Sequence, residues 1–110
     1  MRRKKAIDFI LRPIYQTKDI QGYNCELIKT EKGFVQLLWK KENGKLILRY
    51  SPTTCLTQKV ALEALCEWIE NGEVNNYEEA IKKLKSIKGY IVTEDVKELT
   101  KEIFYLLKHL

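Results

Sequence analysis

Residues 35–50 read VQLLWKKENGKLILRY, and this stretch decides the fold. Asn43-Gly44 separates two runs in which apolar and polar residues alternate. A two-residue type I′ turn requires positive φ at both central positions, and Asn-Gly tolerates this better than other pairs. The stretch therefore predicts a hairpin. Pairing outward from its turn places Leu37 opposite Tyr50, Leu38 opposite Arg49, Trp39 opposite Leu48, and Lys40 opposite Ile47.

A second turn precedes this hairpin, at Glu31-Lys32-Gly33. A type I turn closed by a left-handed glycine makes a three-residue loop of this composition. With such a loop, Cys25 faces Trp39 and Leu27 faces Leu37. The two turns then agree on one buried sheet face, made by Tyr23, Cys25, Leu27, Val35, Leu37, Trp39, Leu46, Leu48 and Tyr50.

Residues 6–16 permit two interpretations. The odd positions 7, 9, 11 and 15 are apolar, as in a strand, whereas Ala6, Ile7, Ile10 and Leu11 suit a helical turn. Pro13 lacks a backbone N–H, and such a residue is tolerated on an edge strand. We therefore expect a fourth, edge strand here, with the helical turn as the alternative.

After Ser51-Pro52 the apolar period changes from two residues to 3.6, which predicts helices. The first spans residues 58–71 and is apolar around most of its circumference, so it should be buried on more than one side. Gly72 ends it. A second helix starts after the capping residue Asn76 and ends at Gly89, and a third starts after Thr93.

These elements predict an α+β fold, an antiparallel three- to four-stranded meander followed by three helices packed on one sheet face. A length of 110 residues suits a single domain, 1–110. Residues 1–5 are expected to form a basic flexible arm. The short apolar segment after this arm contains Asp8 and runs into Arg12-Pro13, so it does not match a signal peptide.

Composition restricts the class of protein. Apolar residues make up 45% of the chain and charged residues 32%, as in ordinary globular proteins. No segment reaches the roughly 18 consecutive apolar residues that would cross a bilayer. Cys25, Cys55 and Cys66 show no Cys-x-x-Cys spacing, which is typical of a protein in a reducing compartment. We expect a cytoplasmic protein without a membrane partner.

The sequence contains no catalytic, metal or cofactor motif. Nucleophilic catalysis usually pairs Ser, Cys or Thr with a histidine base, and the sole histidine, His109, is the penultimate residue. A cation at that position suits the C-terminus of a helix. The five glycines fit turns and helix ends, and no phosphate-binding loop is present. We expect no enzymatic activity, no metal, no cofactor and no small-molecule substrate.

Charge is divided by position. Residues 1–55 carry 12 Lys+Arg against 5 Asp+Glu, whereas residues 56–110 carry 8 against 10. All four arginines lie in the first half, and arginine is well suited to bidentate phosphate contacts. The second sheet face adds cations interleaved with apolar and aromatic groups, as single-stranded nucleic acid requires. We therefore expect binding of DNA or RNA through Arg2, Arg3, Lys4, Lys5, Phe34, Lys40, Lys45 and Arg49.

The same residues have a simpler interpretation. In this interpretation, the N-terminal segment or a second subunit partly covers Phe34, Leu38 and Ile47, and the cations are merely solvated. The lysines at positions 82, 83, 85 and 88 are expected to support their helix through ion pairs with preceding glutamates. The alternative function is a protein–protein interaction module, an adaptor, inhibitor or homodimer subunit that uses the C-terminal helix or the sheet edge.

Overall fold

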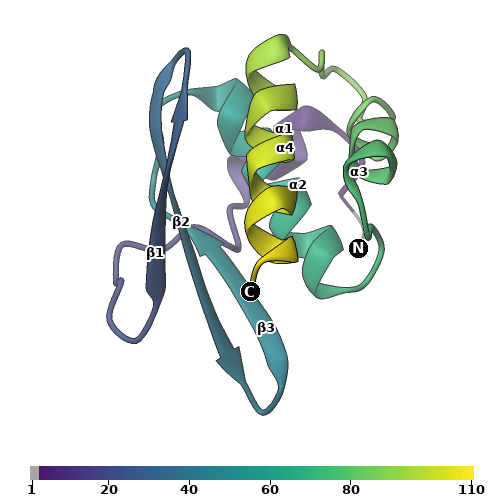
Figure 1. The fold of residues 1–110 in the computed structure, drawn as a ribbon. Helices are drawn as coiled ribbons and strands as arrows, with labels where there is room; N and C mark the ends of the chain where they lie inside the picture. Colours follow the sequence, from purple (N-terminus) through teal and green to yellow (C-terminus); the bar gives the residue numbers. More distant parts are fainter. Residues whose placement is uncertain (1–2) are drawn as a thin grey trace.

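The computed structural model describes residues 3–110. Its elements are, in chain order, α1 (Ala6–Leu11), β1 (Asn24–Thr30), β2 (Gly33–Glu42), β3 (Lys45–Tyr50), α2 (Leu56–Glu70), α3 (Tyr77–Leu84) and α4 (Glu94–Lys108). The strands form an antiparallel meander in the order β1-β2-β3, and the helices lie on one side of it (Figure 1). The α+β class is confirmed, with three strands and four helices in this part of the chain.

The β2–β3 hairpin has the predicted register. Leu37 pairs with Tyr50 and Trp39 with Leu48. Asn43 has a φ of 55° and Gly44 a φ of 77°, the positive values that a type I′ turn requires. On the inner face of this hairpin, Leu37, Leu48 and Tyr50 are buried, whereas Trp39 and Leu46, nearer the turn, are half-buried.

The predicted register of the β1–β2 hairpin is wrong by one residue. Thr30 pairs with Gly33, so that Cys25 lies opposite Leu38 and Leu27 lies opposite Gln36. Because side chains alternate along a strand, this shift moves every β1 side chain to the other face. Leu27 is 61% exposed and Cys25 is exposed too, whereas Ile28 and Thr30 are buried.

A buried polar contact accounts for this register. The Thr30 hydroxyl donates to the carbonyl of Gly33 (2.9 Å) and accepts from the N–H of Lys32 (3.2 Å). It also accepts a hydrogen bond of 2.9 Å from Nε2 of Gln58 in α2, which donates to Asp95 of α4 as well (3.1 Å). Turning Thr30 outward would leave buried Gln58 without this acceptor, and an unsatisfied buried polar group is costly.

Residues 6–11 form helix α1, so the expected edge strand is wrong for this segment. Its buried residue, Phe9, meets the Trp68 ring edge-on with 6.5 Å between centroids. The helix ends at Leu11 because Pro13 disfavours a helical conformation at the residue before it. Strand-like pairing occurs further on, where Gln16 makes an isolated parallel bridge with Tyr50.

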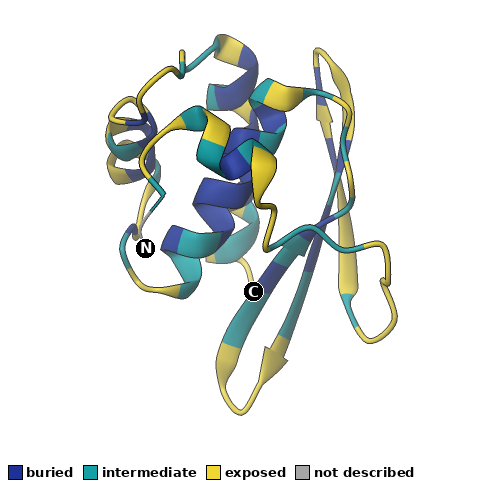
Figure 2. Cartoon of the chain, turned by 180° about the vertical axis from the view of Figure 1, so that it is seen from behind, coloured by how far each residue is buried: buried dark blue, intermediate teal, exposed yellow. Residues whose placement is uncertain are grey.

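Beyond Gln16 the chain passes from the side of β3 to the start of β1, crossing the sheet face that points away from the helices (Figure 2). We call this face the outer sheet face. Leu38 belongs to it by its strand pairing and is nevertheless fully buried. Phe34, on the same face, is 63% exposed.

Helix α2 is the buried centre of the molecule, as its sequence predicts. It contacts α1, β3, α3 and α4, and Figure 2 shows buried positions around much of it. Burial raises the pKa of the Cys66 thiol well above its usual value. The expectation that three helices pack on one sheet face holds for α2 and α4, whereas α3 contacts those two helices.

The predicted caps of α3 and α4 are confirmed. Asn76 Oδ1 accepts from the N–H of Glu79 (2.9 Å), and Thr93 Oγ1 accepts from the N–H of Val96 (3.3 Å). None of the helices described between residues 3 and 110 has the length and apolar character needed to cross a membrane.

Candidate binding surfaces

The residues predicted to bind nucleic acid fall on two separate surfaces. Arg2 lies outside the described residues. Lys4 and Lys5 lie on the helical side of the molecule, beside the segment that follows α3. Phe34, Lys40, Lys45 and Arg49 belong to strands of the sheet, on the opposite side (Figure 1). Of the three arginines in this set, the two that lie within the described residues, Arg3 and Arg49, are both engaged by carboxylates.

Arg3 is held in a buried ion-pair cluster. Its Nη1 donates to Glu63 Oε1 (2.8 Å) and its Nη2 to Glu67 Oε1 (2.9 Å). Burial lowers the pKa of Arg3, but the hydrogen bonds to the two carboxylates outweigh it, so that the pKa is raised. The side chain is 8% exposed, and its charge is compensated inside the protein.

Glu63, the centre of this cluster, is fully buried. Its Oε1 accepts from Arg3 and from the N–H of Ile14 (2.8 Å), and its Oε2 accepts from the N–H of Tyr15 (2.9 Å) and the hydroxyl of Tyr50 (2.7 Å). An ionised carboxylate offers about four acceptor positions. All are used here, so Glu63 joins the N-terminal segment to α2 and β3 and has no position free for a substrate.

Sequence reasoning did not predict this ion-pair cluster. Its one trace in the sequence is Glu63, a charged residue within the otherwise apolar run 60–66. Its partners come from distant segments, so the sequence does not reveal them. Burial, followed by the hydrogen bond to Glu63, raises the pKa of Tyr50, and this hydroxyl therefore stays protonated.

The outer sheet face carries two pairs of an aromatic ring and a lysine. Phe34 lies directly opposite Lys29 across the β1–β2 pairing. The Lys40 ammonium lies 4.7 Å from the centroid of the Tyr23 ring. Buried Leu38 lies between these pairs along β2, so they do not form one continuous exposed surface. Sequence reasoning missed Lys29 here because it assigned to the core the face of β1 that carries Cys25, Leu27 and Lys29.

The remaining sheet residues differ in what they offer a ligand. Arg49 donates to Glu70 Oε2 (2.8 Å) and lies 4.9 Å from the centroid of the Tyr15 ring. Lys40 lies 3.7 Å from Glu42, and Lys45 is exposed at the hairpin end. The face thus presents lysines to solvent, while its arginine is bound to α2.

Two basic runs from distant parts of the sequence meet on the helical side. The N–H of Lys88 donates to the carbonyl of Lys4 (3.0 Å), and the N–H of Ala6 donates to the carbonyl of Lys88 (2.9 Å), as in a short parallel strand pair. Lys4, Lys5 and Lys88 are all exposed, and we call them the lysine patch. Exposed Lys85 lies three residues before Lys88 in the chain.

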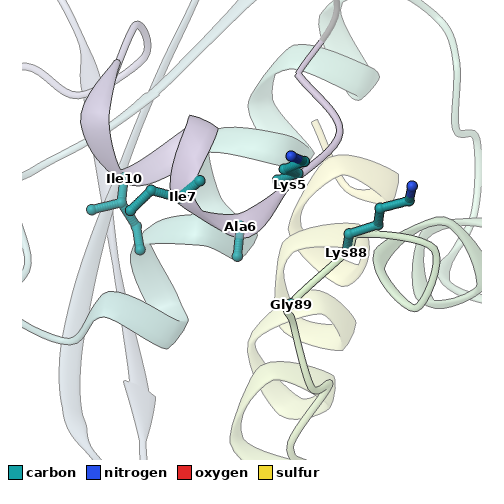
Figure 3. A pocket seen from close by; sticks show the side chains of 6 residues that line it. All are labelled: Lys5, Ala6, Ile7, Ile10, Lys88 and Gly89. Atoms are coloured by element: carbon teal, nitrogen blue, oxygen red, sulfur yellow. The ribbon is translucent and has the colours of Figure 1, made fainter.

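An open hollow of about 410 Å³ lies beside the lysine patch (Figure 3). Ile7 and Ile10 lie toward one end, and Lys5 and Lys88 toward the other. Ala6 and Gly89 complete its lining. The lining supplies apolar contact and positive charge, but it contains no carboxylate, hydroxyl or imidazole group for proton transfer.

Residues 3–110 contain no group of three or more His, Cys, Asp or Glu side chains that could hold a metal ion. No protein-family model, curated protein or solved structure matches this chain. The surfaces themselves are therefore the basis for a functional proposal.

Proposed function

We propose that this chain is a small binding domain, without enzymatic activity, that contacts DNA or RNA through the lysine patch. The observation that carries the proposal is the backbone pairing that joins Lys4 and Lys5 to Lys88. Such pairing fixes the backbones of these three lysines relative to one another before a ligand arrives. Less conformational entropy is then lost on binding than with a free basic arm.

The lysine patch is a better candidate than the outer sheet face for two reasons. The arginine of the sheet face, Arg49, is paired with Glu70, and buried Leu38 interrupts the exposed part of this face. Lysine is a compact charge that contacts phosphate without reading bases. The proposal is therefore for backbone contact with little sequence preference, in which DNA and RNA are distinguished weakly.

Binding to a mixed pool of single-stranded and duplex DNA and RNA, near physiological salt, tests the proposal. The Lys4→Ala/Lys5→Ala/Lys88→Ala variant is compared with the charge-matched Lys29→Ala/Lys40→Ala/Lys45→Ala variant of the sheet face. We expect the first to lose binding and to reduce the log–log salt slope by about 2 for single strands, since each neutralised phosphate contributes about 0.7. The second should retain binding.

Three outcomes contradict the proposal. No binding of the wild-type chain at this salt removes nucleic acid as the ligand. A selective loss in the sheet-face variant assigns the contact to the outer sheet face. An equal, partial loss in both variants indicates general attraction of a basic protein to a polyanion.

A further inference from the structure

Strand β1 has a free edge beside helix α4. The strand order β1-β2-β3 leaves one side of β1 without a neighbouring strand among the described residues. Helix α4 contacts β1, and the two run next to each other in Figure 1. Between them lies a groove of about 360 Å³, lined by Glu26, Leu27 and Ile28 of β1 and by Glu102, Tyr105, Leu106 and His109 at the C-terminal end of α4.

The groove has an exposed apolar wall on each side. Leu27 is 61% exposed on the strand side, and Tyr105 is 64% exposed on the helix side. The Tyr105 and His109 rings lie 4.5 Å apart, which extends this wall along α4. Exposed Phe34 lies diagonally next to Leu27 on the outer sheet face. Large apolar side chains thus flank the free edge of β1 from both directions.

The strand backbone offers a second kind of contact. In an antiparallel sheet, alternate residues of an edge strand direct their N–H and C=O groups away from the neighbouring strand. These groups form a template on which another extended chain can pair. Peptide-binding domains that add a strand at a sheet edge obtain affinity from such main-chain hydrogen bonds and specificity from side-chain pockets beside the edge.

The charge of the groove identifies the partner. Glu26 and Glu102 contribute carboxylates, and its lining contains no lysine or arginine, although the chain as a whole carries a net charge of +5. Lys29, Lys101 and Lys108 are near in sequence but are not part of the lining. A basic segment is therefore attracted to the groove, whereas an acidic one is repelled.

We propose that this groove binds an extended segment of a partner protein in which aliphatic residues alternate with lysine or arginine. The segment adds to the sheet as a fourth strand along β1. Because successive side chains of a strand point to opposite faces, its aliphatic residues contact Leu27 on the outer sheet face. Its cations point toward α4, where they reach Glu26, Glu102 and the Tyr105 ring. This site is on a different surface from the lysine patch, and it does not depend on nucleic-acid binding.

A second copy of this chain fits the groove less well. Two copies that paired their β1 edges about a two-fold axis would present the same groove to each other, because such an interface is isologous. Glu26 and Glu102 of both copies would then be brought together. Like charges placed in contact oppose association.

The probe for this site is a fluorescent seven-residue peptide in which four lysines alternate with three valines, measured by anisotropy with the full chain. We expect this basic peptide to bind. A matched peptide with glutamate in place of lysine should bind at least about tenfold more weakly. The Tyr105→Ala variant should also bind at least about tenfold more weakly, as is usual for an aromatic interface anchor. Tyr105 is exposed, so this variant should fold normally, which circular dichroism checks.

Two N-methylated versions of the basic peptide test strand addition itself. N-methylation at alternate residues blocks the N–H groups of one edge only, so we expect one version to lose binding and the other to retain it. The Lys4→Ala/Lys5→Ala/Lys88→Ala variant should bind the peptide normally, and the peptide result is thus independent of the nucleic-acid result. A lack of anisotropy change at millimolar peptide, equal binding of both methylated versions, or an unaffected Tyr105→Ala variant would overturn the proposal. A dimer in sedimentation that Tyr105→Ala dissociates would assign the groove to a second copy instead.

Discussion

The two hairpins of this sheet share strand β2, yet their registers are set in different ways. In the β2–β3 hairpin, the Asn43-Gly44 turn and the apolar alternation favour the same pairing, and the structure has it. In the β1–β2 hairpin, alternation favours burial of Cys25 and Leu27, whereas the structure buries Ile28 and Thr30. The hydroxyl of Thr30, bonded to Gln58, determines the second register.

The comparison shows that a count of apolar residues can select the wrong face of an edge strand. The face of β1 that carries Leu27 has more apolar residues, but the opposite face carries the Thr30 hydroxyl, which accepts a hydrogen bond from buried Gln58 of α2. Because a shift of one residue exchanges the faces, one polar contact decides which side chains reach solvent. The exposed Leu27 beside the free edge is a consequence of that contact.

The hairpins also differ in how they are anchored to the helices. Tyr50, at the end of β3, is bonded to buried Glu63 and is flanked by the Tyr15–Thr17 backbone. Strand β1 is held through Ile28 and Thr30, and its outer edge is free in the part of the chain that the structure describes. The β3 side should therefore be the more sensitive of the two to substitution.

Glu63→Ala should have the largest effect, because it removes the acceptor of four hydrogen bonds and leaves buried Arg3 with one carboxylate partner. Breaking a buried ion pair from one side usually costs about 3 to 5 kcal/mol. Urea unfolding measures this loss. The control is Glu67→Gln, which affects one hydrogen bond and should cost about 1 kcal/mol. Equal losses in the two variants would show that Glu63 is not the anchor of β3.

The β1 register should appear as a difference between two neighbouring residues. Ile28→Ala should destabilise the protein by about 2 to 5 kcal/mol, the usual cost of truncating a buried aliphatic side chain. Leu27→Ala should change stability by less than about 0.5 kcal/mol, as expected at an exposed position. Thermal or denaturant unfolding of both variants distinguishes the registers. The reverse order would support the pairing of Leu27 with Leu37.

Much of the fold could be predicted because its signals are local. Each of these signals determines the conformation of residues that are close to it in the sequence. They are the Asn43-Gly44 turn, the apolar circumference of residues 58–71, and the caps Asn76 and Thr93. Helix α1 was misassigned because six residues carry a pattern that suits a strand as well as a helix, and Trp68, against which Phe9 packs, is distant in sequence.

The candidate surfaces were less predictable, because each joins segments that are far apart in the chain. The excess of positive charge in residues 1–55 suggested one basic face, but Arg3 and Arg49 pair with carboxylates of α2. Lys4 and Lys5 lie instead beside Lys88, a residue from the acidic half of the sequence. The groove between β1 and α4 depends on the β1 register, which one buried hydroxyl sets.

The reactivity of Cys25 tests the central claim about β1 most directly, since the chain carries this probe naturally. In the structure Cys25 is exposed and Cys66 is buried. The folded protein is treated with a thiol reagent such as a maleimide, and mass spectrometry locates the modified residues. We predict that Cys25 reacts in the folded protein nearly as fast as in urea, whereas Cys66 reacts only after unfolding. Protection of Cys25 to the same extent as Cys66 would contradict the account, because it would place Cys25 in the core opposite Trp39.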